Sequence, residues 1–292
     1  MINRAIIRAK VIQLVYAFYQ NGKNLDSAEK ELLFSLSKAY DLYQYLLLLI
    51  VEITEYEQKL NPESKLATNR FAVQLGANKQ LLQYKENQNR TWKGQAGIIK
   101  KLHSQILSTQ TYGEYVAAKD PSFQLDREFW RKIYKTIVSN NEAIDEVLEE
   151  MSLYWNDDKE IVDTFVLKTI KRLEEEKGEE ADLLPEFSNP TDKDFALKLF
   201  HKTILNEEYY RHLIQDQLSN WSLERLALMD VVIMQTAIAE FFAFVDVPFS
   251  VTINEAVELS KIYSTRNSPG FINGTLDNIS LRLMDEKVLQ KR

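Results

Sequence analysis

Hydrophobic residues recur every three or four positions along most of this chain, a pattern typical of amphipathic α-helices. The first such stretch, residues 2–20, places Ile2, Ile6 and Ile12 on one face and ends before Gly22. The stretch 223–244 is apolar nearly all round, so we expect it to be a central helix. The pattern also predicts helices over residues 25–60, 125–154, 158–176, 192–220, 250–264 and 268–284, with two or three shorter ones between 65 and 120.

Turn-forming residues suggest three regions. Residues 1–120 form an N-terminal helical region, 121–185 a helical insert that begins at Pro121, and 186–292 a C-terminal helical domain. The charged run at 174–180 and the residues up to 192 are expected to form a solvated, mobile linker. The chain has only 8 glycines and 6 prolines in 292 residues. A sandwich or barrel needs a turn about every 8–12 residues, so the predicted fold class is all-α.

The insert resembles the region 190–240 at an offset of 66 or 67 residues. Two explanations stay open: a degenerate duplication of one helical hairpin, or a chance agreement between amphipathic helices. All the matches fall at offsets that differ by only one residue, which favours duplication. The matched positions are Phe129 with Phe195, Lys135-Thr136-Ile137 with Lys202-Thr203-Ile204, Trp155 with Trp221, Asp163 with Asp230, and Thr169 with Thr236.

Charge is distributed unevenly around a formal net charge of -7. Residues 65–103 hold eight Lys or Arg and one acid, whereas residues 142–187 hold sixteen acids and five bases. The basic segment contains Trp92, Tyr84 and a G-x-x-G sequence at 94–97. Cations hold phosphates and aromatic rings stack on bases, so this segment is a candidate RNA surface. The alternatives are an ordinary loop between helices and a basic face that packs on the acidic segment.

The sequence lacks the motifs of catalysis. It has no cysteine, which excludes a disulfide scaffold, a thiolate zinc site and thiol catalysis, and which suits a reducing cytoplasm. Its three histidines have no metal-ligand spacing, and no nucleophile elbow, P-loop or dinucleotide fingerprint occurs. We therefore expect no enzyme activity, no cofactor and no metal. No signal peptide or membrane-spanning stretch is recognisable, so a cytoplasmic location is expected.

Two motifs near the C-terminus carry a family resemblance. Residues 246–263 read DVPFSVTINEAVELSKIY, and residues 267–277 read NSPGFINGTLD. They resemble the patterns D-V-P-x-x-V-A-I-N-E-A-V/I-E-L-A-K and S-x-x-F-V-N-G-V-L-D of the NusB family of transcription antitermination factors. The resemblance covers about residues 2–20 and 190–284, and includes Gln13 and Tyr16 in the first helix. Members are about half this length, so residues 25–190 are an insertion.

The resemblance implies an all-helical bundle of the NusB type without catalytic activity. Such proteins bind the boxA RNA of ribosomal RNA operons together with a small-subunit ribosomal protein, NusE, and serve transcription antitermination and ribosome biogenesis. Other transcription elongation factors and RNA polymerase are indirect partners. By position, Asp230 and Glu240 would bind the partner protein. The implied RNA-binding residues are Arg4, Arg8, Lys10, Tyr16, Lys261, Tyr263 and Phe271, and the basic segment adds Lys93, Lys100 and Lys101.

The sequence departs from the family where basic residues are usual, at Ala5, Ile6, Val231 and Gln235. Each lost phosphate contact weakens RNA binding and its salt dependence. Our hypothesis is that the basic segment 65–103 restores these contacts. The alternative is a helical protein–protein scaffold that keeps the NusB fold but has lost RNA binding. A fused RNA methyltransferase is disfavoured, because the insertion offers no glycine-rich strand-loop-helix for its cofactor.

Overall fold

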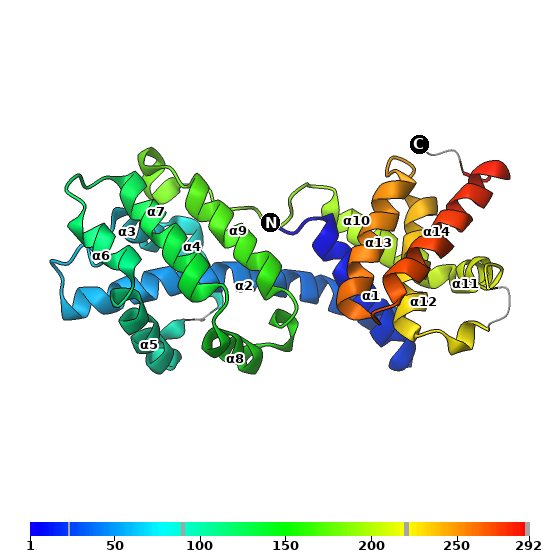
Figure 1. The fold of residues 1–292 in the computed structure, drawn as a ribbon, viewed down its shortest axis with the longest axis horizontal. Helices are drawn as coiled ribbons and strands as arrows, with labels where there is room; N and C mark the ends of the chain where they lie inside the picture. Colours follow the sequence, from blue (N-terminus) through cyan, green and yellow to red (C-terminus); the bar gives the residue numbers. More distant parts are fainter. Residues whose placement is uncertain (23, 89–90, 219–221, 290–292) are drawn as a thin grey trace. The chain divides into compact units, whose positions relative to one another are not determined.

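α-Helices dominate the computed structural model of the chain, which describes residues 1–22, 24–88, 91–218 and 222–289 (Figure 1). Over these residues no strand occurs, and extended backbone pairs only in an isolated bridge between Ile2 and Phe187. The all-α prediction is therefore confirmed. The chain forms two compact units: unit 1 holds Met1 and residues 37–186, and unit 2 holds residues 2–36 and 187–292. The predicted boundary at 120/121 lies inside unit 1.

Unit 2 is built around α12 (Leu228–Ala243), in which every residue from Asp230 to Phe241 is buried. A helix that is apolar on all sides needs neighbours on all sides, which confirms the prediction of a central helix. The neighbours that contact it are α1 (Arg4–Gln20), α10 (Asp192–Leu205), α11 (Glu207–Gln215), α13 (Phe249–Tyr263) and α14 (Ser268–Asp285), and a short helix, η5 (Leu223–Arg225), precedes it.

Unit 1 is organised around the second part of α2 (Leu25–Leu60), a helix whose residues 25–36 belong to unit 2. The Tyr45 ring of α2 stacks on Trp92 and on Trp155, with ring centroids 4.3 and 5.5 Å apart. The other helices are α3 (Arg70–Ala77), α4 (Lys79–Gln88), η1 (Trp92–Gln95), α5 (Ala96–Leu107), α6 (Gln110–Ala117), α7 (Phe123–Ile133), the π-helix η2 (Tyr134–Val138), α8 (Glu142–Met151), η3 (Leu153–Trp155), α9 (Lys159–Arg172) and η4 (Glu175–Glu180).

Two predicted helices are shorter than expected because asparagines end or begin them. The predicted helix 125–154 stops at the π-helix η2 and resumes after Asn141, whose side chain accepts a hydrogen bond from the backbone of Ala143. The predicted helix 192–220 breaks at Asn206, whose amide binds the carbonyl of Lys202. Asparagine competes for backbone groups in this way, so it favours helix ends over helix interiors.

The two halves of the proposed repeat share their order of elements. In unit 1, α7 with η2 is followed by α8, η3 and α9; in unit 2, α10 is followed by α11, η5 and α12. Asp163 and Asp230 both lie near the start of the last helix of each copy. Trp221, the match of Trp155, lies outside the described residues. Duplication of one hairpin remains our proposal, and the common order of elements supports it.

The acidic side chains of residues 174–180 are exposed, as expected, but the run is not a free linker, because residues 174–181 bind to α3 and α4. The Gln74 amide donates to the carbonyls of Glu174 and Gly178, both at 2.9 Å, and the Asn78 amide donates to Ala181 at 2.7 Å. Lys79 pairs with Glu179 at 3.2 Å. The side-chain amides provide hydrogen-bond donors for backbone carbonyls in and next to η4. These bonds anchor residues 174–181 to α3 and α4. No helix in the described part of the chain is long and apolar enough to cross a bilayer.

Candidate functional site

Arg8, an expected RNA ligand, and Glu240, an expected partner ligand, bind each other inside unit 2. Nε and Nη2 of Arg8 donate to the two carboxylate oxygens of Glu240 at 2.8 and 2.6 Å, and the two residues are 5% and 1% exposed. Burial acts to lower the pKa of Arg8, but the hydrogen bond and charges of Glu240 and Glu255 outweigh it and raise that pKa. Such bidentate pairs are strong and directional. This one fastens α1 to α12, so the geometry does not support surface roles for either residue.

Two residues of the 246–263 motif complete this pair: Thr252, which the sequence did not single out, and Glu255, a motif residue expected to serve helix packing. Thr252 Oγ1 donates to Glu240 Oε1 at 3.0 Å, and Glu255 lies 3.4 Å from Arg8 Nη1. Both are on α13, so the pair joins three helices. Their position within the 246–263 motif was the available signal, but a motif alone does not say which distant residue it contacts.

Asp230 has a comparable structural role at the other end of α12. Its carboxylate accepts hydrogen bonds from Ser264 Oγ at 2.5 Å and Ser268 Oγ at 2.9 Å, and it is 6% exposed. Ser264 follows α13 and Ser268 opens α14, so Asp230 fixes the turn between these helices. The carboxylate is thereby occupied within unit 2, and the geometry does not support partner binding by Asp230.

The remaining candidates of unit 2 lie along α1, α13 and α14. The structure brings Tyr263 to α1, because Gln13 Nε2 donates to the Tyr263 hydroxyl at 3.2 Å, and Tyr16 is one turn beyond Gln13. Lys261 is two positions before Tyr263 on α13, so the two side chains do not share a helix face. Lys261 is exposed and pairs with Glu258, while Tyr16, Tyr263 and Phe271 are half-buried. Tyr16 and Tyr263 therefore form an aromatic edge, and Lys261 and Phe271 are separate candidates on α13 and α14.

Arg4 and Lys10 do not join that edge. Arg4 lies twelve residues before Tyr16, a rise of about 18 Å along the helix. Its guanidinium is 4.6 Å from the centre of the Phe195 ring and 3.6 Å from the Asp192 carboxylate, with 41% of the side chain exposed. Lys10 is 2% exposed, so its side chain belongs to the interior of unit 2.

The basic segment of unit 1 is largely committed to the fold. Lys65 donates to the carbonyls of Tyr115 and Ala118, and three further cations pair with carboxylates of unit 1. Lys100 and Lys101 are exposed on α5, with no ion pair among the described residues. The Lys93 side chain and Arg90 lie outside the described part. The three paired cations are Arg70 with Glu175, Lys79 with Glu179 and Glu180, and Lys85 with Glu52.

The aromatic rings of this segment do not offer stacking surfaces. Trp92 is fully buried, its indole N–H donates to the Tyr45 carbonyl at 2.9 Å, and Tyr84 is 6% exposed. A Cβ at Gly94 or Gly97 would meet nothing within 4 Å, so neither glycine is needed for a close approach. The expectation that Trp92 and Tyr84 stack on bases is wrong, and the G-x-x-G sequence is the junction of η1 and α5.

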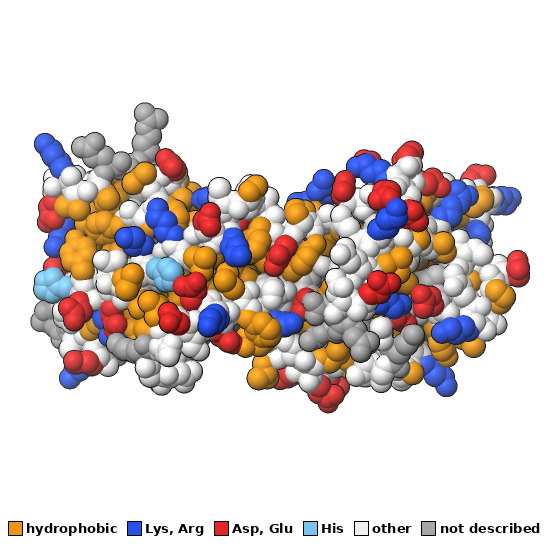
Figure 2. All heavy atoms as spheres, turned by 180° about the vertical axis from the view of Figure 1, so that it is seen from behind, with side chains coloured by type: hydrophobic (Ala, Val, Ile, Leu, Met, Phe, Trp, Pro, Cys, Tyr) orange, Lys and Arg blue, Asp and Glu red, His pale blue; other side chains and the backbone are white. Residues whose placement is uncertain are grey.

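Surface charge is mixed on the face in Figure 2, where Lys and Arg side chains are interspersed with Asp and Glu. Unit 1 also contains a buried pair, His103 Nε2 with the Glu57 carboxylate at 2.6 Å, on α5 and α2. Over the described residues, no group of three or more His, Asp and Glu side chains is placed to hold a metal ion.

Comparisons with known proteins place the similarity in the second half of the chain. The model of a family described as "NusB family" matches residues 161–281. Transcription antitermination protein NusB of Salinibacter ruber (strain DSM 13855 / M31) is 34% identical over 132 residues, which is 43% of this chain and 82% of that protein. The NusB protein of Syntrophotalea carbinolica (strain DSM 2380 / NBRC 103641 / GraBd1) is 46% identical over 88 residues, 30% of this chain and 56% of that protein.

A solved structure is also similar. The match to T. maritima NusB has 32% sequence identity, covers 39% of this chain and 71% of that chain, and has a TM-score of 0.30. Each of these matches leaves more than half of this chain uncovered.

Proposed function

Because this chain belongs to the NusB family of transcription antitermination proteins, we propose that unit 2 binds boxA-type RNA together with the small-subunit ribosomal protein NusE. The family consists of antitermination factors and not of enzymes, in line with the sequence prediction. The observation that carries the proposal is the match to the Salinibacter ruber protein over 82% of its length. The further partners, other elongation factors and RNA polymerase, belong to the same proposal as indirect ones.

The RNA surface that we propose is the edge formed by Tyr16 and Tyr263. Lys261 on α13 and Phe271 on α14 add to it, and Arg4 contacts the RNA separately, about 18 Å away along α1. A half-buried aromatic ring has part of its surface packed in the protein and part open to solvent. A base can stack on the open part, and such stacking contributes about 1–3 kcal/mol per base to the binding free energy. Arg8 and Lys10 contribute by supporting α1 from the interior.

Fluorescence anisotropy of a labelled boxA-type RNA, with and without NusE and across a salt series, tests this function. We expect binding that tightens with NusE and weakens linearly on a log–log plot of affinity against salt. Tyr263→Ala should weaken it about 5- to 150-fold, the loss of one stacking contact, and Tyr263→Phe should keep most of the affinity. Tyr209→Ala, at an exposed tyrosine of α11, is the matched control.

The scaffold alternative has one observation in its favour, since Arg8 is buried against Glu240 and is not available to phosphates. Capture of NusE without RNA binding at any salt concentration would contradict our proposal and establish the scaffold instead.

A further inference from the structure

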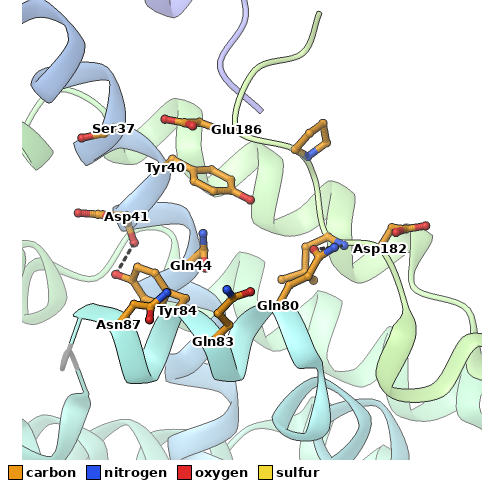
Figure 3. A pocket seen from close by; sticks show the side chains of 12 residues that line it. Ser37, Tyr40, Asp41, Gln44, Gln80, Gln83, Tyr84, Asn87, Asp182 and Glu186 are labelled. Carbon is orange, nitrogen blue, oxygen red and sulfur yellow. Dashed lines mark hydrogen bonds between the residues drawn. The ribbon is translucent and has the colours of Figure 1, made fainter. Parts of the chain in front are cut away.

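A polar groove of about 670 Å³ lies in unit 1, between one face of α2, one face of α4 and the residues 182–186 (Figure 3). Its volume is in the range of small-ligand and peptide sites. Residues three and four apart on a helix share a face, so each helix turns a polar face to the groove. The groove contains none of the residues in the proposed RNA surface. Those faces carry Tyr40, Asp41 and Gln44 of α2 and Gln80, Gln83 and Asn87 of α4.

Gln44 is the unusual residue of this groove. It is 8% exposed, and its amide makes no hydrogen bond to any described residue. Figure 3 shows its side chain between those of Tyr40 and Gln83, directed into the groove. Its amide atoms are not shut off from solvent, so they reach the groove and remain available for hydrogen bonds there. Gln44 therefore offers two donors and one acceptor to whatever occupies the groove.

Hydrogen bonds within unit 1 hold the walls in place. The Tyr40 hydroxyl donates to the Leu184 carbonyl at 3.0 Å, and the backbone N–H of Leu183 donates to Gln80 Oε1 at 3.1 Å. The Tyr84 hydroxyl donates to the Asp41 carbonyl at 3.1 Å, which ties α4 to α2. A groove with fixed walls binds with a smaller loss of entropy than one that must form on binding.

The charge of the lining excludes phosphate ligands. Asp41, Asp182 and Glu186 line the groove, and no Lys or Arg does so among the described residues. Lys38 pairs with Asp41, and Lys177 lies 3.7 Å from Asp182 at an exposed position. The groove therefore repels anions and accommodates cations. Its amides can both donate and accept, as the repeated N–H and C=O groups of a peptide require.

We propose that this groove binds an extended peptide segment, rich in lysine or arginine, of a partner protein. The peptide backbone pairs with the amides of Gln44, Gln83 and Asn87, and its cations lie against Asp182 and Glu186. The interaction is independent of RNA binding by unit 2, and it gives the insertion a role as a second protein-binding site.

Anisotropy with the full-length protein tests this, with a fluorescein-labelled ten-residue peptide of alternating lysine and serine as the probe. The same peptide with glutamate for lysine, and a labelled ten-nucleotide single-stranded RNA, are the comparison probes. We expect the lysine peptide to bind and the other two not to bind in this groove. Hydrogen exchange should show protection of residues 40–44 and 80–87 on addition of the lysine peptide.

Variants separate a specific site from general charge attraction. D182N/E186Q, Q83A and Q44L should each weaken the lysine peptide at least fivefold, while E146Q/E150Q on α8, with the same change in charge, should leave it unchanged. Gln83 is exposed, so Q83A should not disturb folding. If circular dichroism shows that Q44L is unfolded, Q83A still tests the groove. Absence of peptide binding, equal losses in the two double variants, or RNA that protects the groove would each overturn the proposal.

Discussion

At the residue scale, Arg8 and Glu240 show that side chains suited to RNA or a partner can serve the fold. Their double hydrogen bond lies in a region from which water is excluded, and Thr252 adds a donor to the same carboxylate. Removing one member leaves an uncompensated charge and costs about 3–5 kcal/mol, whereas replacing both with apolar residues is often close to neutral. The pair therefore couples the two positions energetically.

We predict that Arg8→Met and Glu240→Leu each lower the free energy of unfolding by about 3–5 kcal/mol. The double variant R8M/E240L should lose less than either single variant, because no unpaired charge remains. Urea titrations followed by circular dichroism measure all four proteins of this cycle. Losses that simply add in the double variant would show that the two residues are not coupled.

The phenol of Tyr40 predicts how stability depends on alkaline pH. Burial, followed by the nearby Glu186 carboxylate, raises the pKa of Tyr40 to about 12, against an ordinary value of about 10. As the pH rises, the phenol loses its proton in the unfolded chain before it does so in the folded protein. The free energy of unfolding therefore falls as the pH rises from about 10 to about 12.

Tyr40→Phe removes both this titration and the hydrogen bond to Leu184. We expect it to be less stable than the wild type by about 1 kcal/mol at pH 7, with a difference that shrinks above pH 10. Urea midpoints at pH 7, 9.5 and 11.5 measure the difference. A gap of the same size at all three pH values would contradict the prediction.

At the element scale, two buried asparagines organise the helices of unit 1. Asn69 caps α3 through the backbone N–H of Ala72, and its amide donates to the Tyr115 hydroxyl. Asn78 ends α3 and accepts from the backbone N–H of Leu81 at the start of α4, while its amide donates to Ala181. An asparagine can do both because its amide has a donor end and an acceptor end. Local capping and the anchoring of η4 therefore depend on the same side chain.

Asn78→Ala should cost about 1–3 kcal/mol through the lost cap and the unpaired buried groups. It should also speed tryptic cleavage at Lys177, because the segment 174–181 loses its anchor. Asn141→Ala, which removes the cap of α8 and a hydrogen bond to the Ile137 carbonyl but no contact to residues 174–181, is the control: it should lower stability without changing cleavage at Lys177. Equal cleavage rates in the two variants would contradict the anchoring role.

The sequence predicted single helices better than the contacts between them. The helix predicted from near residue 25 to about residue 60 agrees with α2, since its periodicity is continuous and Pro62 follows. Breaks at Asn141 and Asn206 were missed because capping depends on side-chain geometry as well as residue type. The Arg8–Glu240 pair joins residues 232 positions apart, and no local pattern encodes such a pairing. For the same reason, the burial of Trp92 in unit 1 could not be predicted.

At the scale of the whole molecule, the two units differ in how they can contribute to RNA binding. Unit 2 carries the matched family motifs, and unit 1 carries the basic segment, of which Lys100 and Lys101 are exposed on α5. If these two lysines contact phosphates, each adds about 0.7–0.9 to the slope of log affinity against log salt.

We predict that K100E/K101E weakens RNA binding and lowers this slope by about 1.4–1.8. K132E/K135E, two exposed lysines of unit 1 outside the basic segment, gives the same change in net charge and should have a smaller effect. Anisotropy titrations at four or more salt concentrations provide the slopes. An unchanged slope in K100E/K101E would mean that the insertion does not restore phosphate contacts.

Unit 2 is made of two stretches of chain separated by the whole of unit 1, and this orders events on the translating ribosome. Chains grow at about 5–20 residues per second, so Glu240 is synthesised on the order of 10–50 s after Arg8, its partner in the ion pair. Unit 1 is complete in the nascent chain during this interval, whereas the apolar face of α1 stays uncovered. We expect α1 to be a binding site for a chaperone until the C-terminal helices are synthesised.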